Sequence, residues 1–370
     1  MTRISYLILI ALASLFTIDT FAQKYAMHMR DSIEIRSNAW QDTITCQMLK
    51  PIGFDRDAGT QTFPLIILLD QQNEFTFEYN LSTIDILCMH QQVPQSVVVG
   101  VPFPIEDRWY LTSFDKRENE SMSGLDKTEK LLFEEIIPTM RRQYNTNGPI
   151  ILVGHSRTAY FANIMMTRHP KELAAVGAFS GFFSKEFSAY DMVKAVSEAP
   201  ARVPMIGANM NLWTGKYCHH YYSAGTSIEE DNYLTDYSVY YVLSDSLLKS
   251  RNDFSHFMVG VQHTHMTSYI VSLQSMLIDY FGEYSKILSH WLYEKCNILN
   301  GDKVVETLRK DFEDLNFRYG SNFIPNPVHI FSIASHYYNE EELEVCNQIL
   351  DFGREYYPMD PDMAPWESDK

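Results

Sequence analysis

Apolar residues along the chain fall into short continuous runs, which is the pattern of strands buried on both faces of a parallel sheet. The clearest run is Pro-Leu-Ile-Ile-Leu-Leu-Asp at 64–70. Before it, alternating apolar and polar residues within 24–50 predict antiparallel strands. Further runs of the buried type lie at 96–101, 150–153, 176–179, 203–207 and 257–261.

Segments with apolar residues at helical spacing separate these runs. They lie at 127–144, 158–168, 233–249 and 267–281. Strands that alternate with helices predict an α/β fold with a mainly parallel, doubly wound sheet. Ligands of such sheets bind at the carboxyl ends of the strands.

From residue 283 onward the pattern is helical only, so we expect one α/β domain over 24–282 and a small helical extension over 283–357. One helix pair cannot bury its own apolar face, and the extension should therefore dock on the main domain or on a partner. The last residues, 358–370, are predicted to form a loose tail.

The N-terminus combines a basic head, a short apolar core and small residues near Ala22. This order predicts a secretory signal peptide over 1–22 and hence an exported protein, periplasmic or secreted. The apolar core is too short for a comfortable membrane span, and no later segment is apolar for long enough. We therefore expect no integral membrane span after cleavage.

The formal net charge is −17, which provides no electrostatic footprint for DNA or RNA and excludes nucleic acid as a partner. The five cysteines are too few and too widely spaced for a disulfide scaffold. Sequence does not indicate the oligomeric state.

The run at 150–153 leads directly into Gly154-His155-Ser156-Arg157-Thr158, and a helical pattern follows. A serine between a buried strand and a helix matches the nucleophile elbow of serine hydrolases, although threonine replaces the usual last glycine. The Arg157 amide at the start of the helix would then face a developing oxyanion.

A serine nucleophile needs a base and a group that orients the base. In this topology the histidine follows the last core strand, where His263 and His265 both qualify. A metal site that combines His219 and His220 with these two is the competing interpretation. No HExxH motif and no carboxylate at ligand spacing supports it, so we expect no metal.

Three segments resemble the esterase D and enterochelin esterase branch of the α/β-hydrolases: 64–70, Gly154–Ser156 and 265–273. The resemblance covers roughly residues 30–282. It implies that Ser156 is the nucleophile and His265 the base. It also implies that the amides of Arg157 and Gln71 form an oxyanion hole, with no cofactor required.

The carboxylate that would orient His265 departs from the family pattern. The family places this Asp or Glu just after the strand equivalent to 203–207. No acidic residue occurs between Pro204 and Ile228. We favour Asp231 as the residue that orients His265. The alternatives are Glu230, Asp236 and, as neutral substitutes, Asn209 and Asn211.

Two side chains are candidates for substrate binding: Arg108, after the strand at 96–101, and Trp213, in an aromatic segment that could cover the site. The sequence therefore predicts an exported serine hydrolase that cleaves small-molecule carboxylic esters through an acyl-enzyme. The alternative is a degenerate hydrolase that binds or scaffolds without turnover, because Thr158, Gln71 and the displaced acid all depart from the family.

Overall fold

The computed structural model describes residues 28–52, 54, 61–198, 218–225, 254–258, 263–299 and 301–367. Within these ranges the strands form one sheet in the order β1-β2-β4-β3-β5-β6-β7-β8. β1 (His28–Ser37) and β2 (Asp42–Pro51) form an antiparallel hairpin, and β2 runs antiparallel to β4. All later pairings are parallel, so the predicted α/β fold with a mainly parallel sheet is confirmed.

The parallel strands coincide with most of the predicted apolar runs. They are β3 (Leu65–Leu69), β4 (Val97–Val101), β5 (Ile150–His155), β6 (Ala175–Phe179), β7 (His219–Ala224) and β8 (Phe254–Met258). β7 is the exception, because we expected 203–207 to follow β6, and that segment lies outside the described residues. The strand that pairs with β6 is instead His219–Ala224.

The sequence of β7, His-His-Tyr-Tyr-Ser-Ala, does not look like a buried strand because most of its side chains carry polar atoms. The structure provides partners for these atoms inside the core. His220 Nε2 lies 2.8 Å from Asn163 Oδ1, and the Tyr221 hydroxyl donates to Asp279 at 2.8 Å. A buried polar group that is hydrogen-bonded is tolerated, and hydropathy alone cannot detect such pairing.

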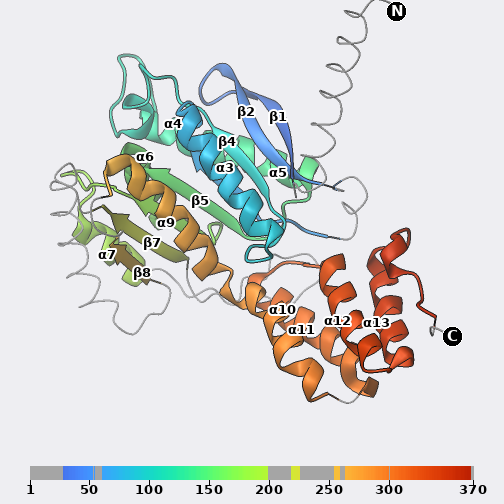
Figure 1. The fold of residues 1–370 in the computed structure, drawn as a ribbon. Helices are drawn as coiled ribbons and strands as arrows, with labels where there is room; N and C mark the ends of the chain where they lie inside the picture. Colours follow the sequence, from blue (N-terminus) through green and yellow to red (C-terminus); the bar gives the residue numbers. More distant parts are fainter. Residues whose placement is uncertain are drawn as a thin grey trace, which may run out of the picture.

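Helices cover both faces of the sheet (Figure 1). One face carries α3 (Glu74–Met89) and α9 (His265–Tyr280), which contact each other. The other face carries α6 (Arg157–Arg168), α7 (Ala189–Glu198) and a longer helical segment. That segment comprises α4 (Gly124–Lys130), a π-helical stretch (Leu131–Ile136) and α5 (Ile137–Tyr144). None of the helices in the described ranges has the length and apolar character needed to cross a bilayer.

The C-terminal region consists of helices, as predicted. α10 (Gly282–Tyr293), α11 (Val304–Tyr319), α12 (Pro327–Asn339) and α13 (Leu343–Tyr356) share their own apolar core. They also dock on the main domain, since the Tyr319 hydroxyl donates to the Tyr280 carbonyl at 2.9 Å. Figure 1 shows these helices beyond the C-terminal end of α9, away from the carboxyl ends of the strands.

The prediction of a loose tail over 358–370 is wrong for its described part. Met363 is fully buried, and its carbonyl accepts a hydrogen bond from Arg354. The Trp366 amide donates to Asn347 Oδ1 at 2.8 Å, and its ring packs edge-on against Phe331. A tryptophan near a chain end can anchor it, because its ring supplies a large apolar surface.

Candidate active site

Ser156 lies at the sharp turn between β5 and α6, at the carboxyl end of a central strand. Its backbone has φ 57° and ψ −117°, a strained conformation that costs a non-glycine residue about 1–3 kcal/mol. A Cβ added to Gly154 would lie 2.3 Å from the Thr158 carbonyl oxygen, so glycine is required there. The strand-turn-helix geometry of a nucleophile elbow therefore forms with threonine at 158.

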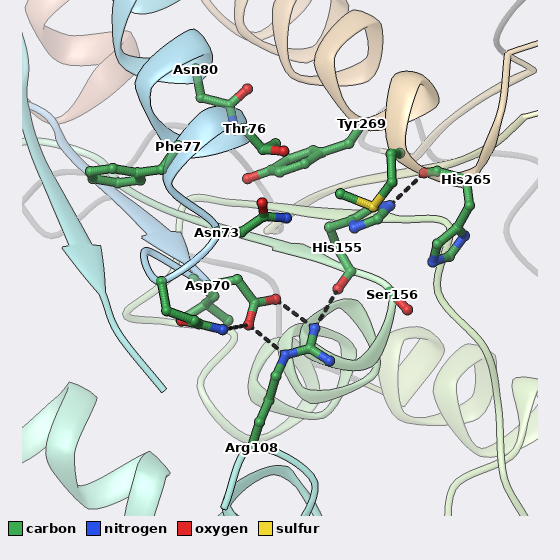
Figure 2. Close-up of a pocket in the computed structure, with 13 residues that line it drawn as sticks. Asp70, Asn73, Thr76, Phe77, Asn80, Arg108, His155, Ser156, His265 and Tyr269 are labelled. Carbon is green, nitrogen blue, oxygen red and sulfur yellow. Dashed lines mark hydrogen bonds and ion pairs between the residues drawn. The ribbon is translucent and has the colours of Figure 1, made fainter. Parts of the chain in front are cut away.

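Thr158 is fully buried and connects the elbow to the neighbouring strand end. Its hydroxyl donates to Asp70 Oδ2 at 2.7 Å and accepts from the His155 amide at 3.0 Å. Asp70 follows β3, and Arg108 binds it through two bonds of 2.6 and 2.7 Å (Figure 2). The threonine that departs from the motif is thus a hydrogen-bonded part of the site.

Thr158→Val is expected to lower the free energy of unfolding by about 1.5–3 kcal/mol, because a buried carboxylate loses a hydrogen bond that its charge strengthens. Urea unfolding measures this loss. Thr167→Val is the matched control, since among the described residues the Thr167 hydroxyl donates only to the Ile164 carbonyl of the same helix. Equal losses in the two variants would show that the Thr158–Asp70 bond contributes nothing special.

The Arg157 amide lies at the first position of α6, where backbone N–H groups have no acceptor within the helix. No hydrogen bond among the described residues uses it. The side chain turns away from the elbow: Nε donates to Thr112 Oγ1 at 2.8 Å, and the guanidinium lies 3.8 Å from the Trp109 ring centroid. Burial lowers the pKa of this guanidinium. Arg157 therefore contributes its backbone to the site, while its side chain holds the loop after β4.

Gln71 does not occupy the predicted position. Its amide donates to the Val101 carbonyl at 3.1 Å, and its Oε1 accepts from the Gln47 amide at 2.8 Å. The prediction that the Gln71 amide is the second oxyanion donor is wrong in this structure, because that N–H is already bonded. The next residue, Gln72, lines the pocket, and no hydrogen bond among the described residues uses its backbone N–H. Its side-chain amide, by contrast, is bonded to Asp70 and to the Phe103 amide.

His265 is the first residue of α9, behind the N-cap residue Thr264. It lines the same pocket as Ser156, at the right of Figure 2. Its carbonyl accepts a 2.7 Å hydrogen bond from His155 Nε2, which fixes the start of α9 against the elbow. His263, the other candidate, is not among the residues that line this pocket, and its Nδ1 lies 3.3 Å from Thr267 Oγ1.

Arg108 lines the pocket as predicted, but its guanidinium is paired with Asp70 (Figure 2). The second candidate for substrate binding, Trp213, lies outside the described residues. So do all the proposed orienting groups. These are Asp231, Glu230, Asp236, Asn209 and Asn211.

The histidines considered for a metal site are far apart. The ring centroid of His219 lies 5.5 Å from that of Tyr280, at the last residue of α9. His265 is the first residue of the same 16-residue helix, which spans about 24 Å. One metal ion cannot bind both. No cluster of three potential metal ligands occurs within the described ranges.

Most residues that line the pocket were not predicted as site residues, among them Asp70, His155, Tyr269 and Asn80. Asp70 ends the first apolar run, so its place at the carboxyl edge of the sheet could have been inferred. Asn80 lies on α3, a helix that was not predicted although Phe77, Leu81 and Ile84 show helical spacing. The stacking of His155 on Tyr269, at 5.0 Å, depends on tertiary packing alone.

The sequence model of the family described as "Putative esterase" matches residues 37–239, which is more than half of the chain. The chain belongs to this family. It is an esterase with the α/β-hydrolase fold, and its substrates are small-molecule esters. No curated protein matches the chain.

Solved structures share the fold of this esterase at low sequence identity. An IroE-like serine hydrolase from Shewanella oneidensis is 14% identical with a TM-score of 0.64, over 89% of this chain and all of that one. An uncharacterised protein from Capnocytophaga ochracea is 13% identical with a TM-score of 0.59, over 89% of both chains. The siderophore hydrolase EstA from Aspergillus nidulans is 15% identical with a TM-score of 0.50, over 68% of this chain and 94% of that one.

Proposed function

We propose that this esterase is an exported serine hydrolase that cleaves carboxylic esters through an acyl-enzyme at Ser156. The observation that carries the proposal is the strained backbone of Ser156, φ 57° and ψ −117°, at the strand-to-helix elbow. This conformation exposes a serine hydroxyl above the sheet, and it is kept only where the surrounding structure enforces it. His265 lines the same pocket and supplies a base.

In the proposed reaction, His265 takes the Ser156 proton while Oγ attacks the ester carbonyl carbon. The carbonyl oxygen becomes an oxyanion that accepts hydrogen bonds from the backbone N–H groups of Arg157 and Gln72. The bond to the alcohol oxygen breaks, and His265 gives its proton to the leaving alcohol. Water then attacks the acyl-enzyme with His265 as base, releasing the acid and restoring Ser156.

We propose Asp231 as the acid that orients His265, and the corrected position of β7 supports it. β7 and β8 are parallel neighbours with Ala224 opposite Met258. Asp231 follows Ala224 by seven positions, and His265 follows Met258 by seven positions. Two segments of equal length that leave paired strand ends at the same edge can meet. Glu230 and Asp236 remain the alternatives.

Export rests on residues 1–22, which lie outside the described residues and have the order of a signal peptide. The alternative function, a degenerate hydrolase that binds or scaffolds without turnover, is suggested partly because Thr158 departs from the elbow motif. Because Thr158 is hydrogen-bonded to Asp70 and the serine keeps its strained backbone, the geometry favours a working enzyme over a binding scaffold.

A fluorophosphonate probe tests the proposal because it reacts only with an activated serine. We expect the wild-type protein to be labelled at one site and Ser156→Ala to be unlabelled, as read by intact-protein mass spectrometry. Ser184→Ala is the matched control, since Ser184 is hydrogen-bonded to the Tyr160 hydroxyl and does not line the pocket. An unlabelled wild-type protein, or labelling that survives in Ser156→Ala, would refute the proposal.

A further inference from the structure

The pocket at Ser156 extends between the N-terminal halves of α3 and α9 (Figure 2). The cavity has a volume of about 260 Å³, more than the elbow and an ester group require. α3 contributes Thr76, Phe77 and Asn80, with Asn73 just before it, while α9 contributes Met266 and Tyr269. The extension therefore has two helical walls and opens onto the nucleophile.

Asn80 is the decisive residue of this extension. Only 1% of its surface is exposed, and within the described part of the chain its Oδ1 has no hydrogen-bond partner. Figure 2 shows Asn80, Thr76 and the Tyr269 ring converging between the two helices. Native proteins seldom keep a buried acceptor unpaired, so an unpaired one that borders a cavity points to a donor supplied by an occupant.

The charged side chains that line the pocket restrict the kind of ligand that it can bind. Among the described lining residues, the only carboxylate and the only guanidinium are those of Asp70 and Arg108. They are bonded to each other at 2.6 and 2.7 Å, so neither leaves a full charge for a ligand. Thr76 adds a half-buried hydroxyl and Asn73 a second amide near the entrance. This lining suits a neutral group with several hydroxyls.

The position of the base indicates which part of the ester lies there. His265 returns its proton to the alcohol oxygen, so the alcohol must leave beside the first turn of α9. That same turn contributes Met266 and Tyr269 to the pocket. We propose that the space between α3 and α9 binds a neutral, polyhydroxylated alcohol portion of the substrate, with a hydroxyl donating to Asn80 Oδ1. The inference rests on the proposed function.

Two acetate esters that differ only in hydroxyls test this specificity. Glycerol monoacetate and n-propyl acetate carry the same scissile bond. We expect the wild-type kcat/KM to favour glycerol monoacetate by about tenfold, because a site built to bond a hydroxyl rejects an analogue without it. In Asn80→Leu, which removes the acceptor at similar volume, the ratio should fall to about one. Thr76→Val should also lower it. Ser82→Ala, an exposed change on the same helix, should leave it unaltered.

Two further measurements separate failure of this inference from failure of the proposed function. Hydrolysis of p-nitrophenyl acetate reports the serine chemistry alone. Saturation-transfer NMR with glycerol monoacetate and Ser156→Ala reports binding without turnover, and the signal should disappear in the double variant with Asn80→Leu. If p-nitrophenyl acetate is cleaved but neither the wild-type preference nor the NMR signal depends on Asn80, the inference is overturned and a bound water satisfies the amide. An Asn80-dependent NMR signal without hydrolysis would support the subsite and refute only the chemistry.

Discussion

His265→Ala is expected to lower kcat/KM for p-nitrophenyl acetate by about 10⁴-fold, because the Ser156 hydroxyl then has no base to accept its proton. The position of His265 explains the size of the effect. It begins α9, its backbone carbonyl is held by His155 Nε2 at 2.7 Å, and it lines the same pocket as Ser156. Steady-state kinetics on the purified variant measure the loss.

His263→Ala is the matched control, because His263 is two residues away and does not line the pocket. We expect it to change kcat/KM by less than about threefold, since its contact is with Thr267 at 3.3 Å. A large loss of kcat/KM in His263→Ala with a small loss in His265→Ala would show that the base is His263 and not His265. Circular dichroism of both variants shows whether the fold is retained.

Most of the fold could be predicted from the sequence because the central strands are buried on both faces. Such strands, like Leu65–Leu69 and Val97–Val101, are typically apolar throughout, and a continuous apolar run is easily detected. β7 escaped detection because its polar side chains are paired inside the core: His220 with Asn163 and Tyr221 with Asp279, both distant in the sequence. Long-range polar pairing has no local signature.

The elbow at Ser156 could be predicted for a related reason. A serine elbow has a local motif, and the conformation that it requires is enforced by neighbours such as Gly154. Which backbone N–H after β3 faces the pocket could not be predicted, because the choice between Gln71 and Gln72 depends on how the chain turns there. Asp70 has φ 68°, and with this turn the Gln71 amide donates to Val101. A left-handed aspartate is uncommon and has no clear sequence signal.

The Asp70–Thr158–Arg108 network shows how one departure from a family pattern can be accommodated. Threonine at 158 departs from the sequence motif of the elbow, which has glycine at this position. In the structure its hydroxyl reaches Asp70, which is held on its other side by Arg108. The Thr158 hydroxyl therefore adds a hydrogen bond between the elbow after β5 and the end of β3, beside the pocket that Ser156 lines.

The identity of the acid gives the second large effect. Asp231→Asn is expected to lower kcat by about 10³- to 10⁴-fold, because an amide can hold the imidazole but cannot stabilise the imidazolium, and it favours the wrong tautomer. Glu230→Gln and Asp236→Asn are matched controls from the same short segment, and each should cost less than about tenfold. Kinetics with p-nitrophenyl acetate measure all three.

The length of the chain between the paired strand ends and the two residues supports Asp231 as the acid. Ala224 and Met258 are paired at the carboxyl ends of β7 and β8, and a seven-residue segment spans up to about 25 Å. A carboxylate at Asp231 is therefore within chain reach of His265 at the start of α9. If Asp231→Asn retains wild-type kcat and Glu230→Gln loses it, the acid is Glu230. If all three variants stay within tenfold of wild type, no carboxylate of this segment orients His265.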